Sequence, residues 1–171
     1  MAYEKASIIF QIAATHSAIA STQNRSDPEG LKRSFYYFRT SAGMLTYINE
    51  NFLHAPSTDL SRDVVKFLVD IMVAQAHEVF FEKCRDERKT PALVAKVAAQ
   101  TASLYTGLVD SVKEFQGKKI FDHNWVTLLN VSRLRLTAGI QLSLFLDQSK
   151  VLDISFTVLP FTCRLCCRKA W

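Results

Sequence analysis

The chain has 171 residues, 49% of them hydrophobic and 22% charged, which is typical of one soluble globular domain or part of one. Five glycines and four prolines are few, so a mainly helical chain with few sharp turns is expected. The formal net charge of +5 is concentrated in residues 131–171 and residues 1–130 are nearly neutral, which argues against a nucleic-acid-binding protein.

Two helices are expected in the first 52 residues. The first spans about residues 3–23, and the residues near one face are Ile8, Ile12, His16 and Ile19. In the connection that follows, Asp27 is a good N-cap and Pro28 suits the first position of the second helix. This helix should end near residue 52. Its apolar stripe keeps a three-four spacing and comprises Leu31, Phe35, Phe38, Ala42, Leu45, Ile48 and Phe52.

Three more helices are expected further along the chain. The third spans about residues 62–88 and is capped by Ser61, and the fourth runs from the Thr90-Pro91 start signal to about residue 115. Asp122 can cap a fifth helix that starts near His123. Because no strand alternation occurs before residue 130, the pattern predicts an all-α fold of antiparallel helical hairpins.

The third expected helix is apolar on two sides. One side comprises Val64, Leu68, Ile71, Met72, Gln75 and Val79. A second stripe, about 120° away, comprises Val69, Val73, Ala76 and Phe80. Such a helix is either buried between two neighbours or lines a groove for another protein's amphipathic helix.

A small apolar patch is expected where the third and fourth helices meet. If the two helices form a hairpin, Phe80 approaches Leu93 and Val97 near the turn. The basic residues expected around this patch are Lys83, Arg85, Arg88, Lys89 and Lys96. A patch with a basic rim suits an amphipathic, partly acidic helix.

Three stretches of this chain resemble the BRO (Bro-one) domain family. They are "YEKASIIFQIAATHSAIASTQNRSDPEGLKRSFYYFRTSAGML", "VDIMVAQAHEVFFEKC" and "ALVAKVAAQTASLY". The family includes Alix, the fungal vacuolar-sorting Bro proteins and the PalA pH-signalling scaffold, and the fungal vacuolar-sorting branch looks most similar. The resemblance implies an all-helical, boomerang-shaped fold with a tetratricopeptide-like core of paired helices.

The resemblance also implies a function as an endosomal-sorting adaptor. Family members bind the C-terminal amphipathic helix of an ESCRT-III subunit of the Snf-seven (CHMP-four) type, for sorting into multivesicular bodies. By position, the partner-binding residues are Phe80, Leu93 and Val97. A cytoplasmic adaptor recruited to endosomes through its partners is therefore expected. The alternatives are a PalA-type pH-signalling scaffold and a non-functional product of a truncated or mis-spliced gene.

The resemblance covers residues 1–130, as a partial domain, and stops at Asn130. The family continues with an alanine- and charge-rich helix, whereas residues 131–171 contain no glutamate and are rich in Leu, Phe and Cys. Val131-Ser132 is what a typical fungal splice-donor sequence encodes. The hypothesis for this tail is translation of an unspliced intron or of a shifted frame.

No catalytic, cofactor or metal motif is found in the sequence. The two-residue spacing between Cys163 and Cys166 lacks the further ligands that zinc requires, and His77-Glu78 is not followed by a second histidine four residues on. The carboxylates are interpreted as solvated faces and caps. With Cys84 the one cysteine before residue 130, no disulfide framework is expected. No signal peptide and no membrane-spanning segment are expected either.

Overall fold

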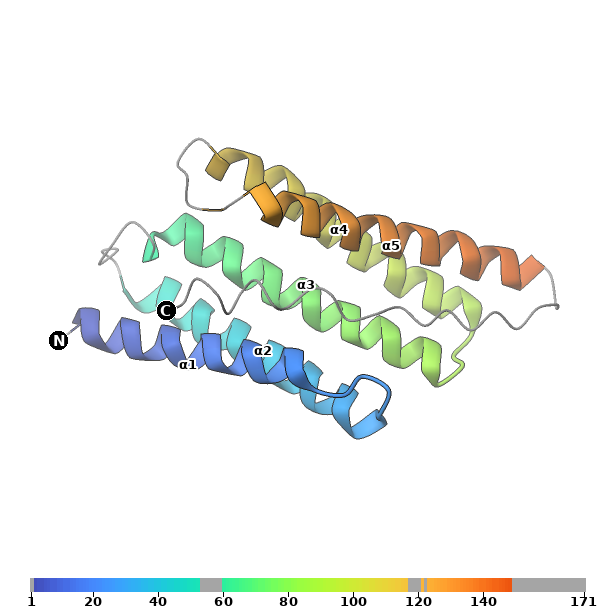
Figure 1. The fold of residues 1–171 in the computed structure, drawn as a ribbon, viewed down its shortest axis with the longest axis horizontal. Helices are drawn as coiled ribbons and strands as arrows, with labels where there is room; N and C mark the ends of the chain where they lie inside the picture. The colour runs from blue at the N-terminus through green and yellow to red at the C-terminus, as the bar shows by residue number, and fades with distance from the viewer. Residues whose placement is uncertain (1, 53–59, 117–120, 122, 149–171) are drawn as a thin grey trace.

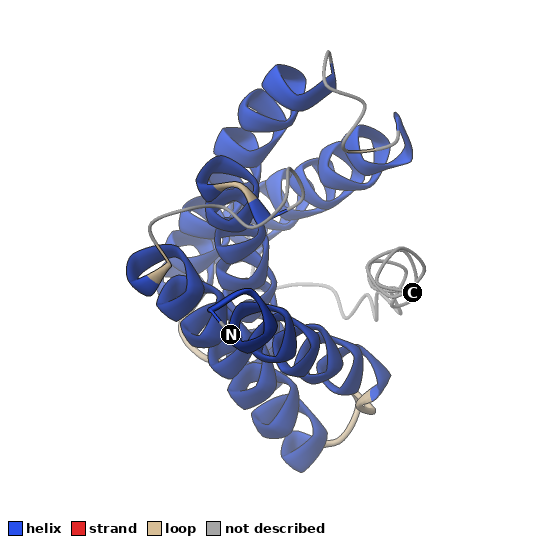
Figure 2. Cartoon of the chain, turned by 90° about the vertical axis from the view of Figure 1, so that its left-hand side faces the viewer, coloured by secondary structure: helices blue, strands red, loops and turns tan. Residues whose placement is uncertain are grey.

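The structure is a computed structural model that describes residues 2–52, 60–116, 121 and 123–148. This part of the chain forms five α-helices and no strand: α1 (Ala2–Thr22), α2 (Pro28–Asn51), α3 (Arg62–Asp86), α4 (Pro91–Gln116) and α5 (His123–Gln148). Each helix packs against the next in the chain, and α3 lies between the α1–α2 pair and the α4–α5 pair (Figure 1). Viewed from the end, the row of helices is bent rather than flat (Figure 2). The predicted all-α fold of antiparallel hairpins is confirmed.

The helix starts follow the sequence signals closely. The Gly30 backbone N–H donates to Asp27 Oδ2 over 3.2 Å, so Asp27 caps α2 as expected. Ser61 occupies the N-cap position of α3, but its side chain makes no capping hydrogen bond. The helix ends at Asp86, two residues before the expected end. The expected cap Asp122 lies outside the described residues.

The face of α1 that packs against α2 carries small side chains. Ile8 and Ile12 are 59% and 41% exposed, whereas Ala13 and Ala20 are fully buried. The hydroxyls of two buried α2 serines each donate to an α1 carbonyl oxygen, Ser41 to Ala13 over 2.8 Å and Ser34 to Ala20 over 2.9 Å. Small side chains at seven-residue spacing allow the helices to approach until these bonds form. Alanines, rather than the exposed Ile8 and Ile12, therefore line the face of α1 that packs against α2.

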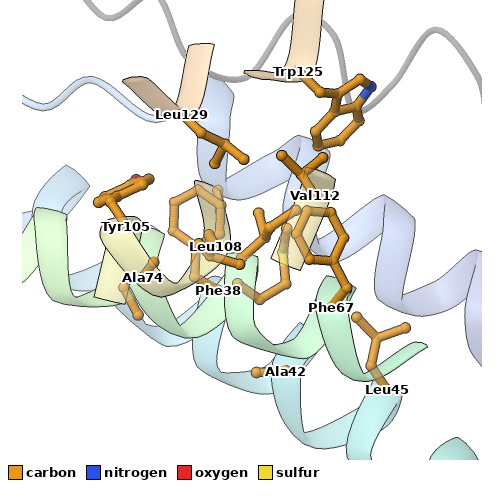
Figure 3. Close-up of a cluster of buried hydrophobic side chains, with 14 of the residues drawn as sticks. Phe38, Ala42, Leu45, Phe67, Ala74, Tyr105, Leu108, Val112, Trp125 and Leu129 are labelled. Atoms are coloured by element: carbon orange, nitrogen blue, oxygen red, sulfur yellow. The ribbon is translucent and has the colours of Figure 1, made fainter. Parts of the chain in front are cut away.

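One hydrophobic core joins all five helices described. In Figure 3, Leu108 and Val112 of α4 lie between Trp125 and Leu129 of α5 above and Phe38 and Phe67 of α2 and α3 below. Aromatic rings fill the end of the core away from the α3–α4 turn, with ring centroids 4.8–5.6 Å apart. These rings belong to Phe67, Phe115, Phe121 and Trp125. The core fixes α3 and α4 rigidly against each other.

Among the described helices, α4 is the one that is long and apolar enough to cross a membrane by length and composition. Its apolar side is buried in the bundle, where Val94, Ala98, Leu108 and Val112 are at most 6% exposed. Its exposed positions include Lys96 and Asp110. Packing against α3 and α5 accounts for the hydropathy of this helix.

Candidate helix-binding surface

The two apolar sides of α3 differ in their surroundings. Ile71 and Val79 on the first side are 2% or less exposed, and Ala76 on the second side is 3% exposed. For most of its length α3 is thus a central helix buried between neighbours. The exception is Phe80, near its C-terminal end, which is 40% exposed.

The other two residues of the expected patch lie at the start of α4. Leu93, in the first turn, is 41% exposed, and Val97, one turn later, is half-buried. Since α3 ends at Asp86 and α4 begins at Pro91, Phe80 and Leu93 lie at the same end of the hairpin. The three residues Phe80, Leu93 and Val97 are called the docking surface below.

The turn beside the docking surface has a defined backbone geometry. Arg88 adopts a left-handed conformation with φ of 51°. The Lys89 N–H donates to the Cys84 carbonyl and the Arg88 N–H to the Arg85 carbonyl, each over 3.0 Å. This is the Schellman arrangement that ends helices, with arginine where glycine is usual. It satisfies the last carbonyls of α3 and reverses the chain within a few residues.

The ring neighbour of Phe80 comes from α2 and was not expected. The rings of Phe80 and Phe35 are 6.2 Å apart between centroids and tilted by 41°. The guanidinium carbon of Arg39 lies 5.5 Å from the centroid of the Phe35 ring. Apolar surface therefore continues from Phe80 on α3 to Phe35 on α2, and it ends at the exposed side chain of Arg39.

Three of the basic residues expected around the patch already pair with acidic residues. Lys83 and Lys89 both pair with Glu87, at 3.8 and 3.3 Å, and Arg85 pairs with the neighbouring Asp86 at 3.0 Å. A hydrogen bond from Lys32 to Glu29 raises the pKa of that lysine, and Glu87 adds to the shift.

On the face of α3 opposite Phe80 lies a buried ionic cluster. Glu78 is fully buried and Glu82 is 13% exposed at its side chain. Both carboxylates pair with Arg25, from the α1–α2 connection, and with Arg135, from α5. The Tyr105 hydroxyl of α4 donates to Glu78 Oε2. The interpretation of the carboxylates as solvated faces and caps was therefore wrong at Glu78.

Burial is the largest cause of the pKa shifts of Glu82 and Arg135. It raises the pKa of Glu82 despite the nearby Arg25, and it lowers the pKa of Arg135 to about 10, with repulsion from Arg25 adding to the shift. One sequence signal could have revealed the cluster, namely two glutamates four residues apart within a helix that is apolar on two sides. The arginines that complete it come from distant segments.

The described residues contain no group of three or more His, Cys, Asp and Glu side chains that could hold a metal ion. Cys84 is buried, and burial raises the pKa of its thiol. The cysteines from Cys163 to Cys167 lie outside the described residues.

The chain is similar in sequence to fungal vacuolar protein-sorting proteins. The vacuolar protein-sorting protein BRO1 of Cryptococcus neoformans is 60% identical over 131 residues, which is 77% of this chain and 14% of that protein. The vacuolar protein-sorting protein bro1 of Emericella nidulans is 53% identical over 77% of this chain and 13% of that protein. The chain thus spans about one seventh of the length of these relatives.

The fold leads to the same group of proteins. A solved complex of the ALIX BRO1 domain with CHMP4C matches with a TM-score of 0.79 and 30% sequence identity, over 87% of this chain and 43% of that chain. The family model of the BRO1-like domain matches residues 1–149, so this match extends beyond Asn130. On the combined evidence of sequence and fold, the chain belongs to the BRO1-like domain family.

Proposed function

We propose that this chain is an adaptor of endosomal protein sorting that binds the C-terminal amphipathic helix of an ESCRT-III subunit of the Snf7 (CHMP4) type. The proposed contact residues are Phe80, Leu93 and Val97. The adaptor is cytoplasmic, is recruited to endosomes through its partners, and acts in vacuolar protein transport without catalysis.

One observation carries this proposal. Two large apolar side chains, Phe80 and Leu93, are exposed at one end of a rigid hairpin, in a chain with the fold of the ALIX domain that was solved with CHMP4C. Exposed apolar residues held by well-packed helices suit the apolar stripe of an incoming helix. Preorganisation also reduces the entropy lost on binding.

Leu93→Asp tests the proposal directly. The purified 171-residue chain and the variant are titrated with the C-terminal helix peptide of a CHMP4-type subunit by isothermal calorimetry. We expect the variant to bind at least ~100-fold more weakly, because the contact would desolvate an unpaired carboxylate. Since Leu93 lies in the first turn of α4, an acidic residue there is compatible with the helix.

Leu134→Asp is the matched control. Leu134 is 61% exposed on α5, outside the docking surface, so its replacement should leave the affinity unchanged. Circular dichroism checks that both variants remain helical. Equal affinity of the Leu93→Asp variant and the wild type would rule out this surface as the binding site, and no binding by the folded wild type would rule out the proposed partner.

A further inference from the structure

The contact between Phe80 and Phe35 links the docking surface to a third helix, α2. Phe35 is half-buried and packs against the core, so its position is fixed. Its ring contacts the Phe80 ring on one side, and Arg39 lies over it one helical turn further along α2. A partner that covers Phe80 therefore comes close to the guanidinium of Arg39.

The charges on α2 single out Arg39. Lys32 pairs with Glu29 at 2.6 Å and Arg33 with Asp27 at 3.9 Å, so these two cations already have acidic partners. Among the described residues Arg39 makes no ion pair, and its contact is with the Phe35 ring. A guanidinium that stacks on an aromatic ring keeps its N–H edges free for a carboxylate.

We propose that Arg39, held by Phe35, is a specificity-determining residue that pairs with a carboxylate beside the apolar stripe of the bound helix. This inference rests on the proposed function and extends the contact from α3 and α4 onto α2. The occupant is an amphipathic helix with an acidic residue at the edge of its apolar stripe. The apolar residues supply contact area, and the ion pair sets the register and orientation of the helix.

Arg39→Glu tests the inference, with the same CHMP4-type helix peptide and the full chain. We expect affinity to fall at least about tenfold for Arg39→Glu and less for Arg39→Gln, because only the glutamate adds repulsion. The loss should shrink as salt is raised, since exposed charges are screened. Arg39 is exposed, so neither variant should alter the fold.

Arg62→Glu is the control with the same change of charge. Arg62 is exposed at the start of α3, about 27 Å along the helix from Phe80, so its replacement should change affinity less than about twofold. In a second series each acidic residue of the peptide is replaced by lysine in turn. One of these peptides should bind the Arg39→Glu chain more tightly than it binds the wild type.

The outcomes separate the two proposals. If the wild type binds the peptide and Arg39→Glu binds equally well, the role of Arg39 is wrong and the docking surface stands. If Arg39→Glu and Arg62→Glu weaken binding equally, the effect is one of net charge and the specific pair is wrong. If the folded wild type does not bind, the proposed function fails and this inference fails with it.

Discussion

At the scale of single residues, one face of α3 carries buried carboxylates, and the opposite face carries the exposed ring of Phe80. Glu78 and Glu82 each lie 200° around the helix from Phe80, so the face that holds the ionic cluster points away from the docking surface. Breaking a buried ion pair by removing one partner typically costs about 3–5 kcal/mol, which makes rotation of α3 unfavourable. The cluster thus keeps Phe80 at the surface.

The raised pKa of Glu82 gives a prediction with a definite sign. The folded chain holds the Glu82 proton more tightly than the unfolded chain does, so the ionised carboxylate lowers the free energy of unfolding at neutral pH. This destabilisation disappears as the pH falls through the pKa that Glu82 has in the folded chain, because the carboxyl group then becomes neutral. We therefore expect the free energy of unfolding of wild type to rise relative to that of Glu82→Gln when the pH is lowered from 7 to about 5. Urea unfolding at each pH measures this difference.

An exposed carboxylate on the same helix supplies the control. Asp86, 43% exposed at its side chain, is replaced by Asn and the unfolding experiment repeated at each pH. A stability difference between wild type and Glu82→Gln that stays constant or shrinks on acidification would contradict the effect of burial on Glu82.

At the scale of elements, the α3–α4 turn sets where the docking surface lies. The Schellman hydrogen bonds end α3 and allow α4 to begin at Pro91, so that Leu93 and Val97 lie at the same end of the hairpin as Phe80. The left-handed backbone of Arg88 is unfavourable for a residue with a Cβ atom. The turn is thus well hydrogen-bonded but strained at one residue.

Glycine at this position should relieve the strain. We expect Arg88→Gly to raise the free energy of unfolding by about 0.5–1 kcal/mol, because the lower strain outweighs the extra entropy of glycine in the unfolded chain. Chemical denaturation measures the change, and Arg85→Gly, inside α3, should instead destabilise by about 1 kcal/mol. If Arg88→Gly destabilised the chain as much, the strain at this turn would be negligible.

At the scale of the whole molecule, residues beyond Asn130 take part in the fold. The helix α5 continues through Asn130 to Gln148 without a break. Leu136 is fully buried, and Arg135 pairs with both glutamates of α3. Whatever the origin of residues 131–171, the first part of that segment closes the α3–α4–α5 side of the bundle.

Two shortened chains test this closure. A chain that ends at Asn130 lacks a buried leucine and one partner of a buried carboxylate, so it should be less stable by about 5 kcal/mol or more than a chain that ends at Gln148. Thermal and urea unfolding followed by circular dichroism compare them. Arg135→Met in the longer chain isolates the ionic contribution, expected to be about 3 kcal/mol. Equal stability of the two chains would show that residues 131–148 are dispensable.

Periodicity and capping signals by themselves predicted the five helices, the fold class and the two-sided character of α3. These are local properties, since a helix stripe repeats every three or four residues and a cap such as Asp27 acts within one turn. The helix pattern also grouped Phe80, Leu93 and Val97 in one apolar patch, and the resemblance to the BRO family added the partner that binds there, which stays a prediction. The exposure of Phe80 and Leu93 agrees with it.

Which apolar face is covered and which charges are buried depends on how the helices pack against one another. Alanines rather than isoleucines of α1 face α2, because close helix approach depends on the serines opposite them. Phe35 meets Phe80, and Arg25 and Arg135 meet Glu78, through contacts between residues far apart in the chain. A one-dimensional pattern records which side of a helix is apolar or charged. Which neighbour that side meets depends on how the helices pack in three dimensions.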